Sequence, residues 1–509
     1  MKKIILVEYH NWKCQYIPYF FLLKVLKKKN DTVESFITFS FFLTDSSFKR
    51  FIDSIKIFLG NIFSLKGFGF AKSIGVNKIF TPKIKKNHIS KALDFLEKFQ
   101  KKKNSRERII NLKINNVHVG DIIYDSYLKS YNVPTIEVLD PKFINFFKNF
   151  ITLFFYWEDY FKKNNVKTVM IVHDTYLTGI PARIAISKKI KTIVPTTSKI
   201  YQLNKKIPNT GKEFLFYKNK FSKLKKTFKK TALKYSQKEL VQKFKGIKFN
   251  YYYPDANESP FKKIYSKKKI RSNNKYKVLI LTHSFIDSPN VFGGALFPDT
   301  YQWLIFLLKI SKETNYQWYI KTHSGFNNYE DPTIKIVKNL ISNHSNIIWL
   351  DSRTSHIQII NEGIDAVLTS YGSAGSEYPF FNIPVINASL NNPHIKYNFN
   401  IHPKSIKSLK TIIYDLPKIK LKINKDEIRE YFFMHKILPQ ENWLGININE
   451  FIYKMGGEKK MYSNKNTYNL LMSKINEKKV LDNLKKFIST KGYSFEYNLI
   501  KYIQTINKL

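Results

Sequence analysis

The sequence predicts an α/β protein with two domains, each built on a parallel sheet covered by helices, and with extra helices outside the sheets. Three observations lead to this fold class. The chain has 509 residues, which is too many for a single hydrophobic core of ordinary size. Short apolar runs alternate with amphipathic segments in both halves. Residues 277–388 repeat strand and helix signals at close and regular spacing, as doubly wound sheets do.

Residues 277–388 carry the clearest pattern and predict a compact doubly wound domain with right-handed crossovers. The predicted strands are 277–283, 316–323, 346–351, 365–370 and 384–388, and the predicted helices lie near 298–313, 331–342, 354–362 and 373–381.

The N-terminal half alternates in the same way but with long insertions, and no order of elements is assigned to residues 47–105. The predicted strands are 3–7, 35–42, 166–172 and 191–197, and the predicted helices are 17–29, one that begins at Gly120 and one that begins near Gly179. The apolar segment 143–157 is too short to span a bilayer, which leaves a core helix or an interfacial helix.

Composition places the domain boundaries. Residues 265–277 form a charged connector, so the predicted domains are 1–265 and 275–425, followed by a helical tail at 426–509.

The formal charge of +48 does not by itself indicate a nucleic-acid-binding protein. Only seven of the 86 basic residues are Arg, whereas readers of phosphates and bases favour the bidentate Arg fork. The excess of Lys, Asn, Ile, Phe and Tyr instead follows A/T-rich codons. We therefore predict no specific nucleic-acid partner, and peripheral contact with an anionic membrane stays open.

Cysteine usage and the N-terminus indicate a cytoplasmic protein. A single Cys14 excludes an internal disulfide and a cysteine-based zinc cluster. The first apolar run is interrupted by Glu8 and His10 before a signal-peptide core could form.

Polar side chains gather where three predicted strands of the second half end, which is the edge where open α/β sheets bind ligands. A basic side chain, a histidine and a helix N-terminus can hold a diphosphate. These features favour a site for a nucleotide-linked donor substrate. The candidate donor-binding residues are Thr282, His283 and Ser284 after the first strand, Lys321 and His323 at the end of the second, and Ser370, Gly372, Ser373, Gly375, Ser376 and Glu377 after the fourth. No metal ligand set is predicted.

Candidate catalytic residues come from the N-terminal half. Asp121 and Asp125 lie one turn apart on one face of a predicted helix. They could serve as acid and base, or Asp121 could cap the helix while Asp125 faces solvent. His173 and Asp174 follow a buried strand, and there functional and structural roles are equally open.

The stretches IKTH and DAVLTSYGSAGSEYPFFNIPVINA resemble the donor-binding half of GT-B glycosyltransferases of bacterial capsule and surface polysaccharide biosynthesis, the group that includes the Kdo transferases. Lys321 and His323 match the family's basic-x-His-Pro strand end, with Ser324 in the place of Pro. Ser370, Ser373, Gly375 and Glu377 match its second motif. GDIIYDSYL and HDTYLTGIPARIA are similar to further stretches of such enzymes.

The resemblance implies two Rossmann-like domains that face a cleft, with a nucleotide sugar in the C-terminal domain and a glycan or lipid-linked acceptor in the N-terminal one. It implies a metal-independent transferase with no cofactor, in which a base from the N-terminal domain activates the acceptor. The alternatives are a nucleotide-sugar epimerase or hydrolase of the same fold, and a non-catalytic basic protein that binds membranes or nucleic acid.

Overall fold

The computed structural model describes residues 2–10, 13–37, 55, 57–60, 62–63, 67–102, 104–196, 199–247, 259–262, 267–291, 293–323, 331–440, 443–446, 454–455 and 465–495. Parts of the predicted features, namely residues 38–42 of the second strand and Ser324, lie outside these ranges.

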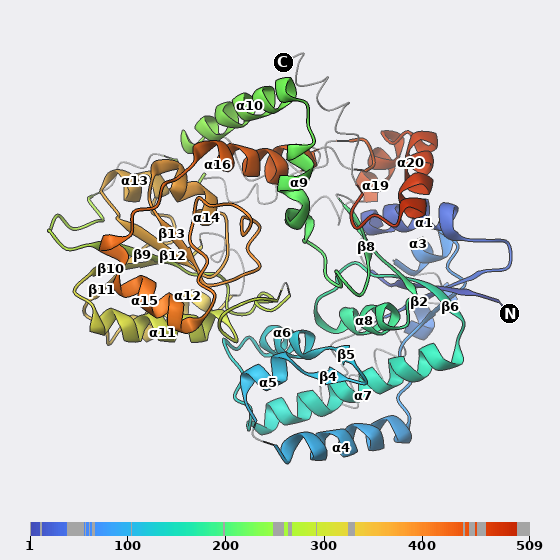
Figure 1. Cartoon of the computed structure of the whole chain (residues 1–509). Helices are drawn as coiled ribbons and strands as arrows, with labels where there is room; N and C mark the ends of the chain where they lie inside the picture. Colours follow the sequence, from blue (N-terminus) through green and yellow to red (C-terminus); the bar gives the residue numbers. More distant parts are fainter. Residues whose placement is uncertain are drawn as a thin grey trace. The chain divides into compact units, whose positions relative to one another are not determined.

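The chain divides into two compact units (Figure 1). Unit 1 comprises the described parts of 1–130, 136–210 and 441–497, and unit 2 comprises 131–135 and the described parts of 211–440. The predicted ranges differ from this division at 211–265, which belongs to unit 2, and at 441–497, which belongs to unit 1. The predicted boundaries rest on composition, whereas the two units are defined by packing between residues distant in sequence: Phe244 shares a core with Phe433, and Leu484 shares one with Ile5.

Unit 1 is built on a mostly parallel sheet. Only its last strand runs antiparallel to its neighbour among the described strands. The order across the sheet is β3 (Lys78–Phe80), β2 (Thr32–Phe36), β1 (Ile4–Glu8), β6 (Val166–Met170), β7 (Lys191–Pro195) and β8 (Ile200–Leu203). A small hairpin, β4 (Lys113–Ile114) and β5 (Val117–His118), lies outside it. The strand β8 was not predicted.

Helices from both ends of the chain cover the sheet of unit 1. They are α1 (Tyr16–Leu26), α3 (Gly67–Ser73), α4 (Lys86–Gln100), α5 (Arg106–Ile110), α6 (Gly120–Tyr131), α7 (Pro141–Lys163), α8 (Gly179–Ser187), α19 (Lys465–Ser473) and α20 (Glu477–Thr490). The core joins Ile5 and Val7 of β1 to Phe21 of α1 and Leu484 of α20. The C-terminal helices thus complete the core that the first strand begins.

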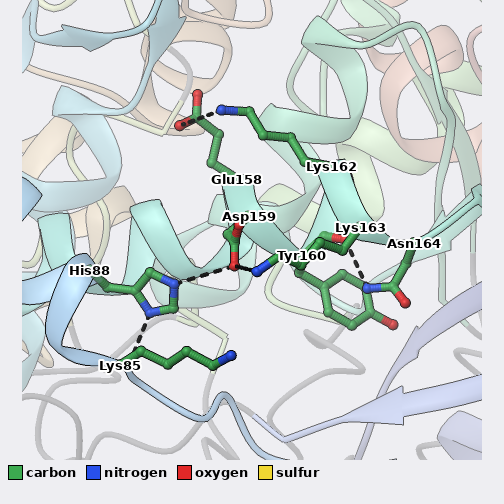
Figure 2. A network of polar contacts seen from close by, with 8 residues as sticks. All are labelled: Lys85, His88, Glu158, Asp159, Tyr160, Lys162, Lys163 and Asn164. Atoms are coloured by element: carbon green, nitrogen blue, oxygen red, sulfur yellow. Dashed lines mark hydrogen bonds and ion pairs between the residues drawn. The ribbon is translucent and has the colours of Figure 1, made fainter.

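The long helix α7 packs along α4, and a polar network joins the two (Figure 2). The Nδ1 atom of His88 accepts the backbone N–H of Lys85, and its Nε2 lies 3.5 Å from Asp159, which also pairs with Lys163 at 2.7 Å. Burial lowers the pKa of His88, and this effect outweighs the attraction of Asp159. The cluster fixes one helix against another, and we assign it a structural role. Most apolar side chains of residues 143–157, from Phe143 to Trp157, are buried, so this segment forms the core helix rather than the interfacial one.

Unit 2 contains a fully parallel sheet of five strands in its described residues. The order across the sheet is β11 (Ile347–Leu350), β10 (Gln317–Lys321), β9 (Lys277–Leu281), β12 (Ala366–Thr369) and β13 (Val385–Asn387). Because the chain first adds strands on one side of β9 and then continues on its other side, the direction of winding reverses between β9 and β12.

Alternate residues of each strand in unit 2 pack on opposite faces, as in any pleated sheet. Val278 and Ile280 contact the cluster of α11 (Thr300–Glu313), α12 (Thr333–Ile341) and α15 (Ile406–Tyr414). Leu279 joins the cluster of α13 (His356–Asn361), α14 (Ala374–Glu377) and the 3₁₀ turn η6 (Tyr378–Phe381). With both faces covered, the strands are apolar throughout.

A third cluster in unit 2 consists of helices that precede and follow the sheet. It unites α9 (Tyr217–Ser222) and α10 (Lys226–Phe244) with α16 (Lys425–Phe432) and the π-helical turn η8 (Phe433–Ile437). The predicted connector packs instead in the cluster of α13 and α14, because Ile270 is fully buried there and the backbone N–H groups of Lys269 and Ile270 donate to Glu362. The connector is therefore part of unit 2.

The predicted fold class, α/β with two Rossmann-like domains, is confirmed by the two parallel sheets and their covering helices. All five predicted strands between 277 and 388 are present. The predicted cleft concerns how the domains are placed, and it stays a prediction. Among the described residues, no helix has the length and apolar character needed to cross a bilayer.

Candidate functional site

The carboxyl edge of the sheet in unit 2 is the first candidate site. In doubly wound sheets, ligands bind at this edge where the strand order reverses, here between β9 and β12. Thr282 follows β9, Thr322 follows β10, and both are buried. Within the described residues, neither hydroxyl has a hydrogen-bond partner, nor does that of Thr354 beyond β11. Buried hydroxyls without partners are costly, so this edge is suited to a polar ligand.

The predicted donor residues after β9 have different surroundings. The ring of His283 lies edge-on to Tyr371 of the turn after β12, with centroids 6.3 Å apart. The hydroxyl of Ser284 donates to Asp331 at 2.5 Å and accepts the N–H of Ile286. His283 thus points to the reversal point, whereas Ser284 joins its own loop to Asp331, which precedes α12.

Lys321 and His323 meet at this edge. Lys321 ends β10 and is 3% exposed, and burial lowers its pKa to about 8, although Asp351 and Glu377 act in the opposite direction. Partial desolvation, Lys321 and His283 lower the pKa of His323 to about 4. Since Glu377 influences both residues, the ends of β10 and β12 lie within electrostatic reach of each other.

The turn after β12 differs from the prediction in its details. The predicted helix near 373–381 is a single α-helical turn that continues as the 3₁₀ turn η6. Ser373 has helical backbone angles and makes no side-chain cap, and the hydroxyl of Ser376 donates back to the carbonyl of Ser373. So short a helix has only a small dipole. A phosphate at this turn would therefore be bound by backbone N–H groups and neighbouring cations and not by a helix dipole.

Two glycines in the turn are required for different reasons. Gly372 has a φ of +136°, which side chains disfavour, and a Cβ there would have open space around it. Gly375 has ordinary angles, but a Cβ would lie 2.2 Å from Nε2 of His394. The turn is therefore shaped by a close approach of the backbone to a histidine.

Behind the turn lies a buried network that sequence analysis missed. His394 is 0% exposed, and its Nδ1 lies 2.9 Å from the amide nitrogen of Asn400, which donates to the carbonyl of Gly375 at 2.5 Å. Burial, with His402 nearby, lowers the pKa of His394 to about 3, so the ring is neutral. The NNPH segment after the last predicted strand was the available signal.

Glu377 is buried and forms an ion pair with Lys243 of α10, at 2.5 Å. Its carboxylate is thus already neutralised from outside the sheet. Glu377 follows β12 and so lies at the predicted edge. Its ion pair with Lys243 also joins α10, which the sequence assigned to the other domain, to unit 2.

The corresponding edge of unit 1 contains a second group of ionisable side chains, at the reversal between β1 and β6. Glu8 ends β1, is 8% exposed and accepts the N–H of Val172 at 2.7 Å. Burial raises its pKa to about 7, against the effect of the N–H groups of Val172 and His173. Burial and nearby His173 lower the pKa of His10 to about 4.

His173 of this group is among the predicted catalytic residues, whereas Glu8 and His10 are not. In the sequence these two residues only interrupt an apolar run. Their position directly at the end of the first strand was the signal, because the first strand of a doubly wound sheet borders the reversal point. His173 itself is exposed.

The other predicted catalytic residues have structural contacts. Asp174 accepts hydrogen bonds from the N–H and the hydroxyl of Thr210, both at 2.8 Å. Asp121 forms a buried ion pair with Arg183 of α8 at 2.7 Å. Asp125, one turn further along α6, is buried as well. These contacts explain the carboxylates of Asp121 and Asp174 without a reaction, and the catalytic role of all three residues stays a prediction.

Replacing Asp121 by alanine is expected to lower the free energy of unfolding by about 3–5 kcal/mol, because it leaves the Arg183 guanidinium buried without its partner. Chemical denaturation measures the change. Glu97→Ala, which breaks the exposed pair with Lys101, is the control and should have little effect. Equal small effects of the two substitutions would contradict the structural role of Asp121.

No protein-family model and no curated protein sequence matches the chain. Among solved structures, UDP-GlcNAc 2-epimerase of Neisseria meningitidis bound to UDP-GlcNAc aligns over 86% of this chain and 98% of its own, with 11% identity and a TM-score of 0.26. A glycosyltransferase of Rickettsia africae aligns over 93% and 99%, with 12% identity and a TM-score of 0.24. HepE of Anabaena, solved with UDP, aligns over 89% and 98%, with 10% identity and a TM-score of 0.23.

Identities and TM-scores of this size carry no functional weight. The function is therefore inferred from the two sheet edges.

Proposed function

We propose that the protein is a glycosyltransferase that takes a sugar from a nucleotide-activated donor and binds the donor phosphates at the carboxyl edge of the sheet in unit 2. The observation that carries the proposal is the buried Lys321, which adjoins His323 at the end of β10, the strand next to the reversal point of a doubly wound sheet. A buried ammonium is costly unless an anion compensates it. A nucleotide phosphate is the anion that this fold class most often places at such an edge.

The same groups supply the chemistry of transfer. When the bond between sugar and phosphate breaks, negative charge develops on the leaving phosphate, and preorganised cations and N–H donors lower the energy of that state. Lys321 and the N–H groups around Gly372 are the corresponding groups in this chain. The resemblance of IKTH and of residues 365–388 to capsule and lipopolysaccharide transferases supports a surface glycan or a lipid-linked glycan as the acceptor.

Glu8 is the proposed base that removes the acceptor proton. A general base works best when its pKa is close to the working pH, and burial brings Glu8 to about 7. Asp121 and Asp174 are held by Arg183 and Thr210, which makes them weaker candidates. We propose a cytoplasmic enzyme whose lysine excess, 86 basic against 38 acidic residues, favours contact with an anionic membrane that carries the acceptor.

An epimerase of the same fold is the second candidate. It is favoured by Glu8, whose carboxylate is influenced by the backbone N–H of His173: Glu8 and His173 lie at the same strand edge and could remove and return a proton at carbon. Incubating a UDP-sugar in deuterated water without acceptor separates the two. Deuterium in the recovered sugar indicates epimerisation, whereas an unlabelled donor supports transfer.

A thermal-shift screen with UDP, CMP, GDP and TDP tests the donor site. A nucleotide at a hundred times its dissociation constant should stabilise the fold by about 2.7 kcal/mol. His323→Ala should reduce this shift. The control is His344→Ala, because His344 precedes β11 and so lies at the opposite edge of the sheet. If none of the four nucleotides shifts the melting temperature, the donor proposal is wrong.

A further inference from the structure

Lys321 is a buried cation whose surroundings are unusual. Among the described residues, no carboxylate forms an ion pair with its ammonium, although Asp351 and Glu377 lie within electrostatic reach. Glu377 is already paired with Lys243. The positive charge of the Lys321 ammonium is thus buried without a carboxylate paired to it among the described residues.

The direct polar neighbour of Lys321 is His356, the first residue of α13. The Nε2 atom of His356 lies 3.5 Å from the Lys321 Nζ, and its Nδ1 lies 2.7 Å from the hydroxyl of Tyr378. Its backbone N–H donates to the carbonyl of Pro260 at 2.8 Å, and its ring lies 5.5 Å from that of Phe261. The imidazole is therefore held on three sides.

These contacts determine the proton positions on the ring. An ammonium has only donors, so the Nε2 atom that faces it must carry a lone pair. The ring proton then sits on Nδ1 and is donated to the Tyr378 oxygen. Burial, together with the positive charges of Lys321, His323 and Lys243, lowers the pKa of His356 well below its ordinary value, in agreement with a neutral ring.

We infer that His356 is a positioning residue that accepts a hydrogen bond from Lys321 and holds it at the end of β10, and that a bound nucleotide phosphate completes the ammonium's coordination, so that binding takes up a proton. This inference rests on the proposed function and adds His356 and a coupled proton to it. The balance is simple: Lys321 in its amine form gains one proton from buffer and becomes the ammonium that the phosphate neutralises.

The expected pH dependence follows from the ionisable groups that face Lys321. They are Asp351 after β11, His356 on α13, Glu377 on α14 and His323 after β10. Both histidines have lowered pKa values and stay neutral above pH 7. Lys321, with a pKa of about 8, is the group among these that titrates between pH 7 and 9.

Isothermal titration with UDP, in two buffers of different ionisation enthalpy, measures the proton uptake. At pH 8.5 a lysine of pKa about 8 is mostly neutral, so we expect an uptake of about three quarters of a proton per UDP, and almost none at pH 7. The affinity should fall about tenfold from pH 7 to pH 9. Lys321→Met should remove both effects.

The role of His356 is tested with two variants. His356→Phe keeps the ring volume but removes the acceptor, and it should weaken UDP binding about ten- to a hundredfold and move the onset of the affinity loss to lower pH. His356→Gln keeps an acceptor near Nε2 and should restore most of the affinity and the original pH profile. A purely structural role would not move the pH profile, and the melting temperature of each variant without UDP shows whether it folds.

The outcomes are distinct. Proton uptake that disappears in Lys321→Met supports the inference. UDP binding that is independent of pH, or that is unchanged in a folded His356→Phe variant, overturns the inference and leaves the donor site in place. If no nucleotide binds in the screen described above, the proposed function fails and the inference fails with it.

Discussion

Replacing Glu8 by glutamine is expected to lower the turnover number for sugar transfer by about 10²–10⁴, the usual contribution of a general base. Glutamine has nearly the same shape and can still accept the N–H of Val172, but it cannot take a proton. Release of the nucleotide product in the presence of acceptor measures the rate. Nucleotide affinity should not change, because Glu8 belongs to the sheet of unit 1.

The pH profile and the stability of the variant provide independent checks. The wild-type rate should rise with pH up to about 7 and then level off, because the base must be ionised. Glu8→Gln should lack this dependence. Since burial raises the pKa of Glu8 from 4.5, the carboxylate costs stability as the pH rises through 4.5 to about 7, so the variant should be more stable at neutral pH by up to about 3 kcal/mol.

Glu34→Gln is the matched control. Glu34 lies on the neighbouring strand β2, away from the strand end, and accepts the hydroxyl proton of Tyr160 at 2.8 Å. Replacing Glu34 should leave the transfer rate within about twofold of the wild-type rate. Its hydrogen bond to Tyr160 lies away from the strand end, so its loss should affect stability and not catalysis. Unchanged transfer in Glu8→Gln would show that another group is the base.

Replacing Gly375 by alanine is expected to destabilise the fold by about 1–3 kcal/mol and to weaken nucleotide binding. The new Cβ would lie 2.2 Å and 2.3 Å from two atoms of the His394 ring. That ring is fully buried and fixed by Asn400, so it cannot move without breaking the network. Thermal unfolding with and without UDP measures both effects.

Gly492→Ala is the control for Gly375→Ala, because a Cβ at Gly492 would meet atoms no closer than 3.6 Å. The double variant Gly375→Ala, His394→Ser relieves the overlap. It should be less destabilised than the sum of the two single substitutions, by a coupling energy of about 0.5–3 kcal/mol. Additive effects would mean that His394 does not constrain the turn.

The sequence alone was sufficient for the five strands of residues 277–388, and for the strand ends at which their polar residues lie. The reason is local: runs such as 277–281 and 366–369 are apolar throughout because both faces of a parallel sheet are covered, and Gly and Ser residues mark the turns. Lys321 and His323 lie within electrostatic reach of Glu377 because β10 and β12 both border β9 in the sheet.

Tertiary structure alone decided which charges are compensated. Nothing in the sequence near Glu377 indicates Lys243, and nothing near Lys321 indicates His356, because these partners come from helices distant along the chain. The same holds for Arg183, which neutralises Asp121, and for the burial of Glu8. Burial and partner together set a pKa, and both are properties of packing, so the choice between a structural carboxylate and a reactive one required the fold.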